Sequence, residues 1–129
     1  MNKLDRATNH TLKLSHLIHL RGVSGVYSIS CPVTNTVVYI GLSCNVFTRF
    51  KSHINAYDHK TPVGKWMNEC KQTGIVPIFE LLQELPFEKV GFKSRTGRKA
   101  ELKWIKHFKS KGLAELNVYM YPVRDFKVK

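Results

Sequence analysis

Two short segments, each carrying a tyrosine and separated by a turn, constrain the fold of this chain more than any other feature. Gly25–Tyr27 and Tyr39–Gly41 lie in stretches rich in β-branched and aromatic residues, and Pro32–Asn35 between them has the proline and asparagine of a turn. The pattern predicts an antiparallel hairpin. Because a reversal near Asn35 brings residues of the two strands opposite or diagonal to one another, both tyrosines should share one surface.

A helix carrying two further polar residues is expected after this hairpin. Asn45 suits a helix N-cap. The apolar residues after it recur at helical spacing, at Val46, Phe50, Ile54 and Tyr57. Arg49 and His53 are four positions apart, so they lie one turn apart on one side of the helix, next to the apolar stripe. The sequence therefore predicts that two phenols, a guanidinium and an imidazole converge.

A second helix and a third strand are predicted downstream. Thr61 can cap a helix that has Pro62 at its first position and ends at Gly74, which accepts a left-handed backbone. Residues 75–82 then have the composition of a strand. Pro77 lacks the N–H that a sheet ladder needs, so this strand should lie at an edge or be unpaired there.

The last predicted helix is strongly basic but contains one acid. It should begin near Ser94 or Thr96 and end at Gly112. Glu101 lies at helical spacing with three apolar residues, Trp104, Ile105 and Phe108. Its carboxylate therefore points to the edge of the buried stripe, where an uncompensated charge costs several kcal/mol. A metal ion or an arginine should face it; the alternative is a partly solvated glutamate paired with a base of its own helix.

The two ends of the chain have weaker patterns. Residues 1–20 follow neither a strand nor a helix period and are interpreted as a short helix that covers one side of the sheet. Residues 116–119 predict a short strand or extended segment, in which Asn117 could bind a phosphate, hold a tyrosine or form a turn. We interpret the chain as one domain: an extension over 1–20, a core over 21–122 and a basic tail over 123–129.

Bulk composition selects a partner class. A chain of 129 residues fits one domain. Its 21 Lys and Arg against nine Asp and Glu give a net charge of +12, which attracts nucleic acid, although ribosomal proteins, heparin binders and membrane-surface proteins share such a charge. The sequence contains neither a spanning apolar run nor a signal peptide, so a soluble, cytoplasmic protein is expected. Three widely spaced cysteines without a CxxC pair favour reduced thiols over a disulfide framework or a zinc site.

Six features, in this order along the chain, resemble the GIY-YIG nuclease superfamily, whose members cut DNA phosphodiesters with one divalent metal. They are Gly25–Tyr27, Tyr39–Gly41, Arg49, His53, Glu101 and Asn117. Val26 replaces the isoleucine of the first tripeptide, an exchange of one β-branched residue for another that leaves a strand intact. Some members have a lysine directly after the second tripeptide; here Leu42 stands there, so no role for that lysine carries over.

The resemblance implies a fold and a role for each site residue. The fold would be α/β (α+β), with an antiparallel sheet of about three strands flanked by helices. Glu101 would hold Mg²⁺ or Mn²⁺, and Arg49 would bind the scissile phosphate through two donors. Tyr27 would orient or deprotonate the attacking water, which requires its phenol pKa to be lowered. His53 would take the same proton or hold Tyr27, and Tyr39 would position the others.

The expected function is a metal-dependent DNA endonuclease, of bacterial or phage type, that works as a monomer and nicks one strand; the alternative is a dimer whose interface residues 1–20 could form. Further contacts to nucleic acid are expected from Arg98, Lys99, Lys103 and Asn117. The alternative is a non-catalytic DNA- or RNA-binding domain that keeps the nuclease fold. Such a domain would be expected to have lost Glu101, Arg49 or Tyr27, and all three are present.

Overall fold

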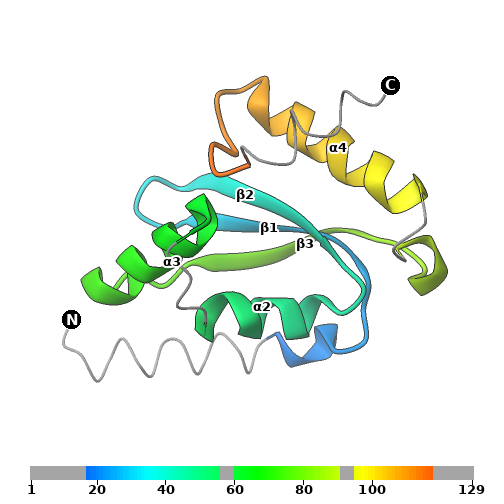
Figure 1. Cartoon of the computed structure of the whole chain (residues 1–129), viewed down its shortest axis with the longest axis horizontal. Helices are drawn as coiled ribbons and strands as arrows, with labels where there is room; N and C mark the ends of the chain where they lie inside the picture. Colours follow the sequence, from blue (N-terminus) through cyan, green and yellow to red (C-terminus); the bar gives the residue numbers. More distant parts are fainter. Residues whose placement is uncertain (1–16, 56–59, 91–94, 118–129) are drawn as a thin grey trace.

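A three-stranded antiparallel sheet forms the centre of the protein (Figure 1). The computed structural model describes residues 17–55, 60–90 and 95–117. The strands are β1 (Gly25–Cys31), β2 (Thr36–Ser43) and β3 (Ile78–Glu84), in the order β2-β1-β3. The helices are η1 (Ile18–Leu20), α2 (Val46–Asn55), α3 (Pro62–Thr73), η2 (Phe87–Lys89) and α4 (Arg95–Lys109). The predicted α/β class, with about three strands flanked by helices, is confirmed.

The predicted hairpin is formed by β1 and β2. Asn35 has a left-handed backbone with φ of 58°, and its N–H donates to the Cys31 carbonyl over 2.7 Å, which closes the turn. Tyr27 pairs with Gly41, two residues after Tyr39, so the two tyrosines are diagonal neighbours across the strands. The hairpin and the shared surface of the two phenols are therefore confirmed.

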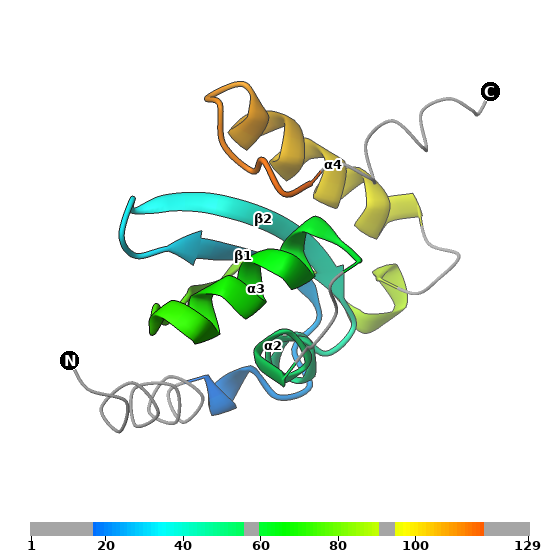
Figure 2. The same ribbon diagram turned by 60° about the vertical axis from the view of Figure 1, so that its left-hand side comes forward.

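Helices cover both faces of the sheet (Figure 2). Successive residues of a strand point to opposite faces, and β1 is buried on both. Tyr27 belongs to the apolar cluster that joins the sheet to α2 and α3 and includes Phe50. Val26 belongs to the cluster that joins the sheet to α4 and includes Ile105. The sheet is thus the middle of three layers, and both outer layers can deliver side chains to it.

Local signals determine where α2 begins and where α3 begins and ends. Thr61 caps α3 through its hydroxyl oxygen, Pro62 is its first residue, and Gly74 ends it with a φ of 78°. The side-chain oxygen of Asn45 accepts a hydrogen bond from the backbone of the first turn of α2 over 3.3 Å. The predicted caps are confirmed, and the predicted apolar residue Tyr57 lies outside the described residues.

β3 begins and ends later than the sequence predicted. Residues 75–82 were the expected strand, whereas the strand runs from Ile78, directly after Pro77, to Glu84. Its end is set by β1, because Glu84 still pairs with Gly25 at the start of that strand. The expected edge position is confirmed, since β3 pairs with β1 alone among the described strands.

The outer edge of β2 is covered by the segment that follows α4. The N–H groups of Ala114 and Leu116 donate to the carbonyls of Val37 and Val38, each over 3.0 Å. In place of the strand or extended segment expected from Leu116, residues 114–117 form a turn, closed by a bond of 3.1 Å from the Asn117 N–H to the Ala114 carbonyl. Residues 1–16 and 118–129, which include most of the predicted N-terminal helix and the whole basic tail, lie outside the described part of the chain.

No helix within the described residues is long and apolar enough to cross a membrane.

Candidate active site

Tyr27 is the centre of the site. Its side chain is 2% exposed, and its hydroxyl lies 2.9 Å from Nε2 of His53. The Phe50 ring packs edge-on against it, with ring centres 5.3 Å apart. On the neighbouring strand, a Cβ atom at Gly41 would lie 2.3 Å from both Cζ and the hydroxyl oxygen of Tyr27. Only glycine at this position leaves room for the tyrosine. The glycine of Tyr39–Gly41 is therefore required by the packing of Tyr27, which belongs to the first tripeptide.

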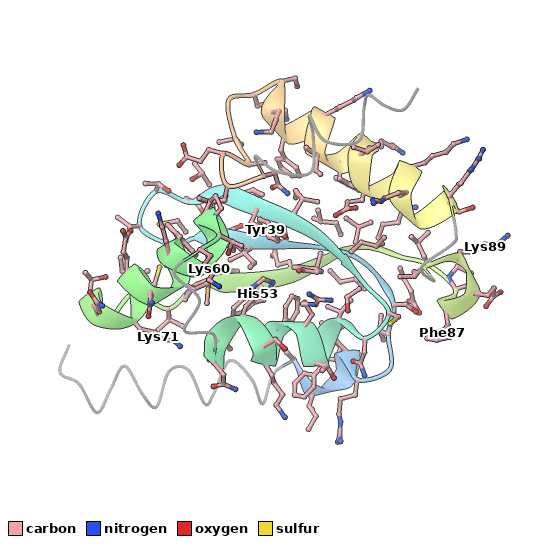
Figure 3. All side chains as sticks on the ribbon, in the orientation of Figure 1. Tyr39, His53, Lys60, Lys71, Phe87 and Lys89 are labelled. Atoms are coloured by element: carbon pink, nitrogen blue, oxygen red, sulfur yellow. The ribbon has the colours of Figure 1, made fainter. Side chains whose placement is uncertain are left out.

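Tyr39 and His53 complete a cluster of three rings with Tyr27. The ring centres of Tyr39 and His53 are 5.7 Å apart, and those of the two tyrosines are 6.4 Å apart. Figure 3 shows Tyr39 on β2 and His53 on α2, both directed into the space between the sheet and this helix. The predicted convergence of two phenols and an imidazole is therefore present in the fold.

Arg49 and Glu101 reach this ring cluster from different layers. Arg49 is exposed on α2, one turn before His53, whereas Glu101 is 5% exposed on α4. Both are close enough to act on the two tyrosines: the charge of Glu101 raises the pKa of each phenol, and the charge of Arg49 lowers it. All five residues predicted to be catalytic thus share one electrostatic environment.

The protein groups hold the proton on Tyr27 and keep His53 neutral. Burial is the largest influence on Tyr27 and raises its pKa well above the ordinary value of a phenol; Tyr39 and Glu101 raise it further and Arg49 opposes them. For His53, burial and then Arg49 lower the pKa to about 4. At neutral pH a protonated phenol and a neutral imidazole therefore share this hydrogen bond, and the imidazole tautomer with its proton on Nδ1 is the one that accepts the Tyr27 O–H at Nε2.

The raised pKa of Tyr27 is opposite to the lowered pKa that the expected role of a general base requires. A general base has to lose its proton, and burial within the protein works against that loss. A positive charge beside the oxygen is what would reverse the shift. Arg49 already acts in this sense, and a cation beside Glu101 would add to it.

Glu101 is suited to a hard divalent cation. Its carboxylate is buried and its charge acts on both tyrosines, and a carboxylate is the kind of oxygen ligand that magnesium and manganese prefer. The described residues contain no group of three or more His, Cys, Asp or Glu that could hold a metal ion by themselves. A cation here would take most of its ligands from water and substrate.

Asn117 has a structural position instead of the expected contact with nucleic acid. It is 1% exposed, its Nδ2 donates to the Ile40 carbonyl over 2.7 Å, and its Oδ1 accepts from the Ile40 N–H over 2.8 Å. The amide thus replaces a strand neighbour on the outer edge of β2. A buried side chain with both ends bonded cannot also bind a phosphate, so Asn117 holds the strand that carries Tyr39 and Gly41.

The basic residues expected to contact nucleic acid divide between two sides of α4. Lys99 and Lys103 are each two residues from Glu101, which rotates them about 200° around a helix of 3.6 residues per turn. They line a hollow of about 410 Å³ with Leu102 and Lys106, away from the carboxylate. Arg98 is three residues from Glu101 and exposed, so it lies nearer to the site.

Gly97 is a contributor that sequence reasoning missed. A Cβ atom there would lie 2.7 Å from the Lys89 carbonyl oxygen and 3.1 Å from Cδ2 of Leu42. The available signal was a glycine inside a helical pattern, which costs about 1 kcal/mol relative to alanine and so indicates close packing. Gly97 lets the start of α4, and with it Glu101, approach the sheet.

Together, the sheet, the ring cluster and the flanking arginine and glutamate define a small α/β nuclease domain. A family model described as the GIY-YIG catalytic domain matches residues 23–114, and the chain belongs to this family. Among solved structures, a mutant of the catalytic domain of intron endonuclease I-TevI is similar, with 27% sequence identity and a TM-score of 0.53, over 69% of this chain and 87% of that chain. No curated protein matches the chain significantly.

Proposed function

We propose that the protein is a DNA endonuclease that hydrolyses phosphodiester bonds with one divalent cation held at Glu101. The observation that carries the proposal is the hydrogen bond of 2.9 Å between Tyr27 and His53, formed where Arg49 and Glu101 both act on the phenol. A purely structural tyrosine would need neither charge beside it. Membership of the GIY-YIG family and the likeness to an intron endonuclease support this reaction.

Proton removal from the attacking water is assigned to Tyr27 and His53 together. With the His53 proton on Nδ1, the Tyr27 hydroxyl donates to Nε2 across the bond of 2.9 Å, so the imidazole is placed to receive the phenol proton as the phenol oxygen receives one from water. Because the pKa of His53 is lowered to about 4, the imidazolium is formed only transiently and returns its proton. This relay joins the two roles that the sequence left open, and Tyr39 supports it through ring packing.

Arg49 is assigned to the scissile phosphate. It is exposed, so a phosphate can approach it without displacing protein groups. Its planar guanidinium can donate two parallel hydrogen bonds to phosphate oxygens and neutralise the charge that develops there. The same charge lowers the pKa of Tyr27, so phosphate binding and water activation depend on one residue.

Glu101 would hold Mg²⁺ or Mn²⁺, which when bound neutralises charge on the phosphate and on the leaving oxygen.

Incubation of the purified protein with supercoiled plasmid, with and without Mg²⁺, tests the proposal. We expect cleavage that requires the cation, and its loss in Glu101→Gln, which keeps the side-chain size. DNA binding by Glu101→Gln should survive, because only a negative charge is removed. An inactive wild type that still binds DNA would instead support the non-catalytic binding domain.

A further inference from the structure

η2 presents an aromatic ring to solvent. Phe87 is 66% exposed, and it is one of three large apolar side chains that are exposed in the described part of the chain, with Ile18 and Val33. Figure 3 shows Phe87 and Lys89 at the end of the molecule, projecting outward from η2. One exposed apolar side chain is ordinary on a protein surface. Phe87 differs from an ordinary exposed side chain because its turn is packed against α4 and lies near the candidate active site.

The base of η2 is fixed against α4. The missing side chain of Gly97 is what allows the contact, since a Cβ there would lie 2.7 Å from the Lys89 carbonyl oxygen and 3.2 Å from Cα of Val90. Val90, the residue after η2, is buried. The backbone of η2, which carries Phe87, is therefore fixed by its packing against α4. Because this turn is already ordered, binding a partner through Phe87 costs little conformational entropy.

This turn is next to the candidate active site. Gly97 and Glu101 are both buried and four residues apart on α4, which is about 6 Å along the helix axis. Ser43 and Glu84 both pair with Gly25, so the chain leaves the sheet toward α2 and toward η2 at the same end. Figure 1 shows η2, the start of α2 and the start of α4 together at this end. A nucleic acid bound at Arg49 and Glu101 would extend past η2.

The charges around Phe87 suit a polyanion. Lys89, Arg95 and Arg98 are exposed on η2 and the first turn of α4, against the exposed acids Glu88 and Glu84. An aromatic ring beside cations is the combination that binds nucleic acid, because the ring stacks on bases while the cations bind the backbone. An apolar protein partner would need a wider apolar surface than this single ring.

We propose that η2 is a second DNA contact, in which Phe87 packs against a nucleobase close to the scissile phosphate while Arg95 and Arg98 bind the backbone. The proposal rests on the proposed function for the identity of the nucleic acid. It adds a contact to bases, which none of the residues already assigned to the site provides. Phe87 would thereby position the DNA strand relative to Glu101.

Binding of the full chain to two probes tests this contact, with EDTA present so that no cleavage occurs. One probe is a mixed-sequence single-stranded DNA, whose bases are free to stack on a ring, and the other is an oligomer of abasic deoxyribose phosphates of the same length, which keeps the charges and lacks the bases. The variants are Phe87→Ala, Phe87→Tyr and, as matched control, Val33→Ala, which truncates a side chain that is 71% exposed in the β1–β2 turn.

Phe87→Ala should weaken binding to the base-containing strand by roughly tenfold or more, as loss of one base–aromatic stack does. It should leave binding to the abasic oligomer unchanged. Phe87→Tyr, which keeps the ring, should restore binding to the base-containing strand, and Val33→Ala should bind both probes like the wild type. Equal losses on both probes, or none on the base-containing strand, would overturn the proposal.

Two further measurements distinguish this proposal from self-association through Phe87 and from the proposed nuclease activity. If the ring served association with a second copy of the chain, Phe87→Ala would change the sedimentation of the free protein and leave the affinity for the base-containing strand intact, which contradicts a base contact. The proposed nuclease fails if wild-type protein does not cut plasmid with Mg²⁺. The binding comparison remains decisive in that case, because it involves no catalysis.

Discussion

Gly41→Ala is the change that most directly tests the geometry of the site. The new Cβ would lie 2.3 Å from Cζ and from the hydroxyl oxygen of Tyr27, whereas ordinary contacts begin at 3.4 Å. The Tyr27 ring must therefore move by more than about 1 Å, because the neighbouring strand backbone is held by its hydrogen bonds. Such a shift breaks the bond of 2.9 Å to His53.

The expected cost follows from the two consequences of this shift. A misplacement of about 1 Å in a catalytic group reduces the rate by roughly a hundredfold. Overpacking a buried site costs about 1–3 kcal/mol of stability, so the variant should remain folded if the wild type has ordinary stability. Initial rates of supercoiled plasmid nicking measure the first effect, and thermal unfolding measures the second.

A double-mutant cycle shows whether Gly41→Ala acts through Tyr27. In a Tyr27→Phe background the hydroxyl has already been removed, so adding Gly41→Ala should reduce the rate little further. The DNA affinity of each variant, measured without divalent cation, controls for lost binding. Full activity of Gly41→Ala in a protein of wild-type stability, or additive losses in the cycle, would refute the reasoning.

Five other outcomes are expected. Arg49→Lys should recover little of the activity that Arg49→Ala loses, since an ammonium lacks the planar pair of donors; a fully active lysine variant would exclude the bidentate role. Tyr27→Phe and His53→Ala should each lower the nicking rate by roughly a hundredfold, and normal cleavage by Tyr27→Phe would assign the base to His53 alone. Because the pKa of His53 is lowered to about 4, the imidazole stays neutral as pH falls through 6.5, so the acid limb of the rate should lie nearer pH 4. Below its unfolded pKa this histidine also destabilises the fold, so the free energy of unfolding should fall between pH 6.5 and pH 4, and less so in His53→Gln. Finally, one site should nick one strand: open-circle plasmid should precede linear DNA from a protein that sediments as a monomer, and linear DNA without that intermediate from a dimer would contradict this.

The sequence by itself determined the elements whose signals are local. The hairpin follows from β-branched residues and from Asn35, which adopts the left-handed conformation that the turn requires. The ends of α3 follow from Thr61 and Gly74, which satisfy or terminate the backbone bonds of their own helix. Each of these signals acts within a few residues, so it needs no knowledge of the rest of the chain. The motif order likewise identified the five residues that the fold brings together.

Only the tertiary structure decided the register and the surroundings of those residues. β3 extends to Glu84 because β1 offers a partner there, a long-range pairing that no local pattern in β3 records. Asn117 is buried on Ile40 instead of facing DNA because the segment after α4 returns to the edge of β2.

The protonation states of Tyr27 and His53 were also decided only by the tertiary structure. The pKa of Tyr27 is raised and that of His53 is lowered mainly because helices from separate parts of the chain exclude water from them. The sequence could name both side chains, but desolvation depends on everything packed around them. For the same reason the contact of Gly41 with Tyr27, which a single methyl group would destroy, became visible only in the folded protein.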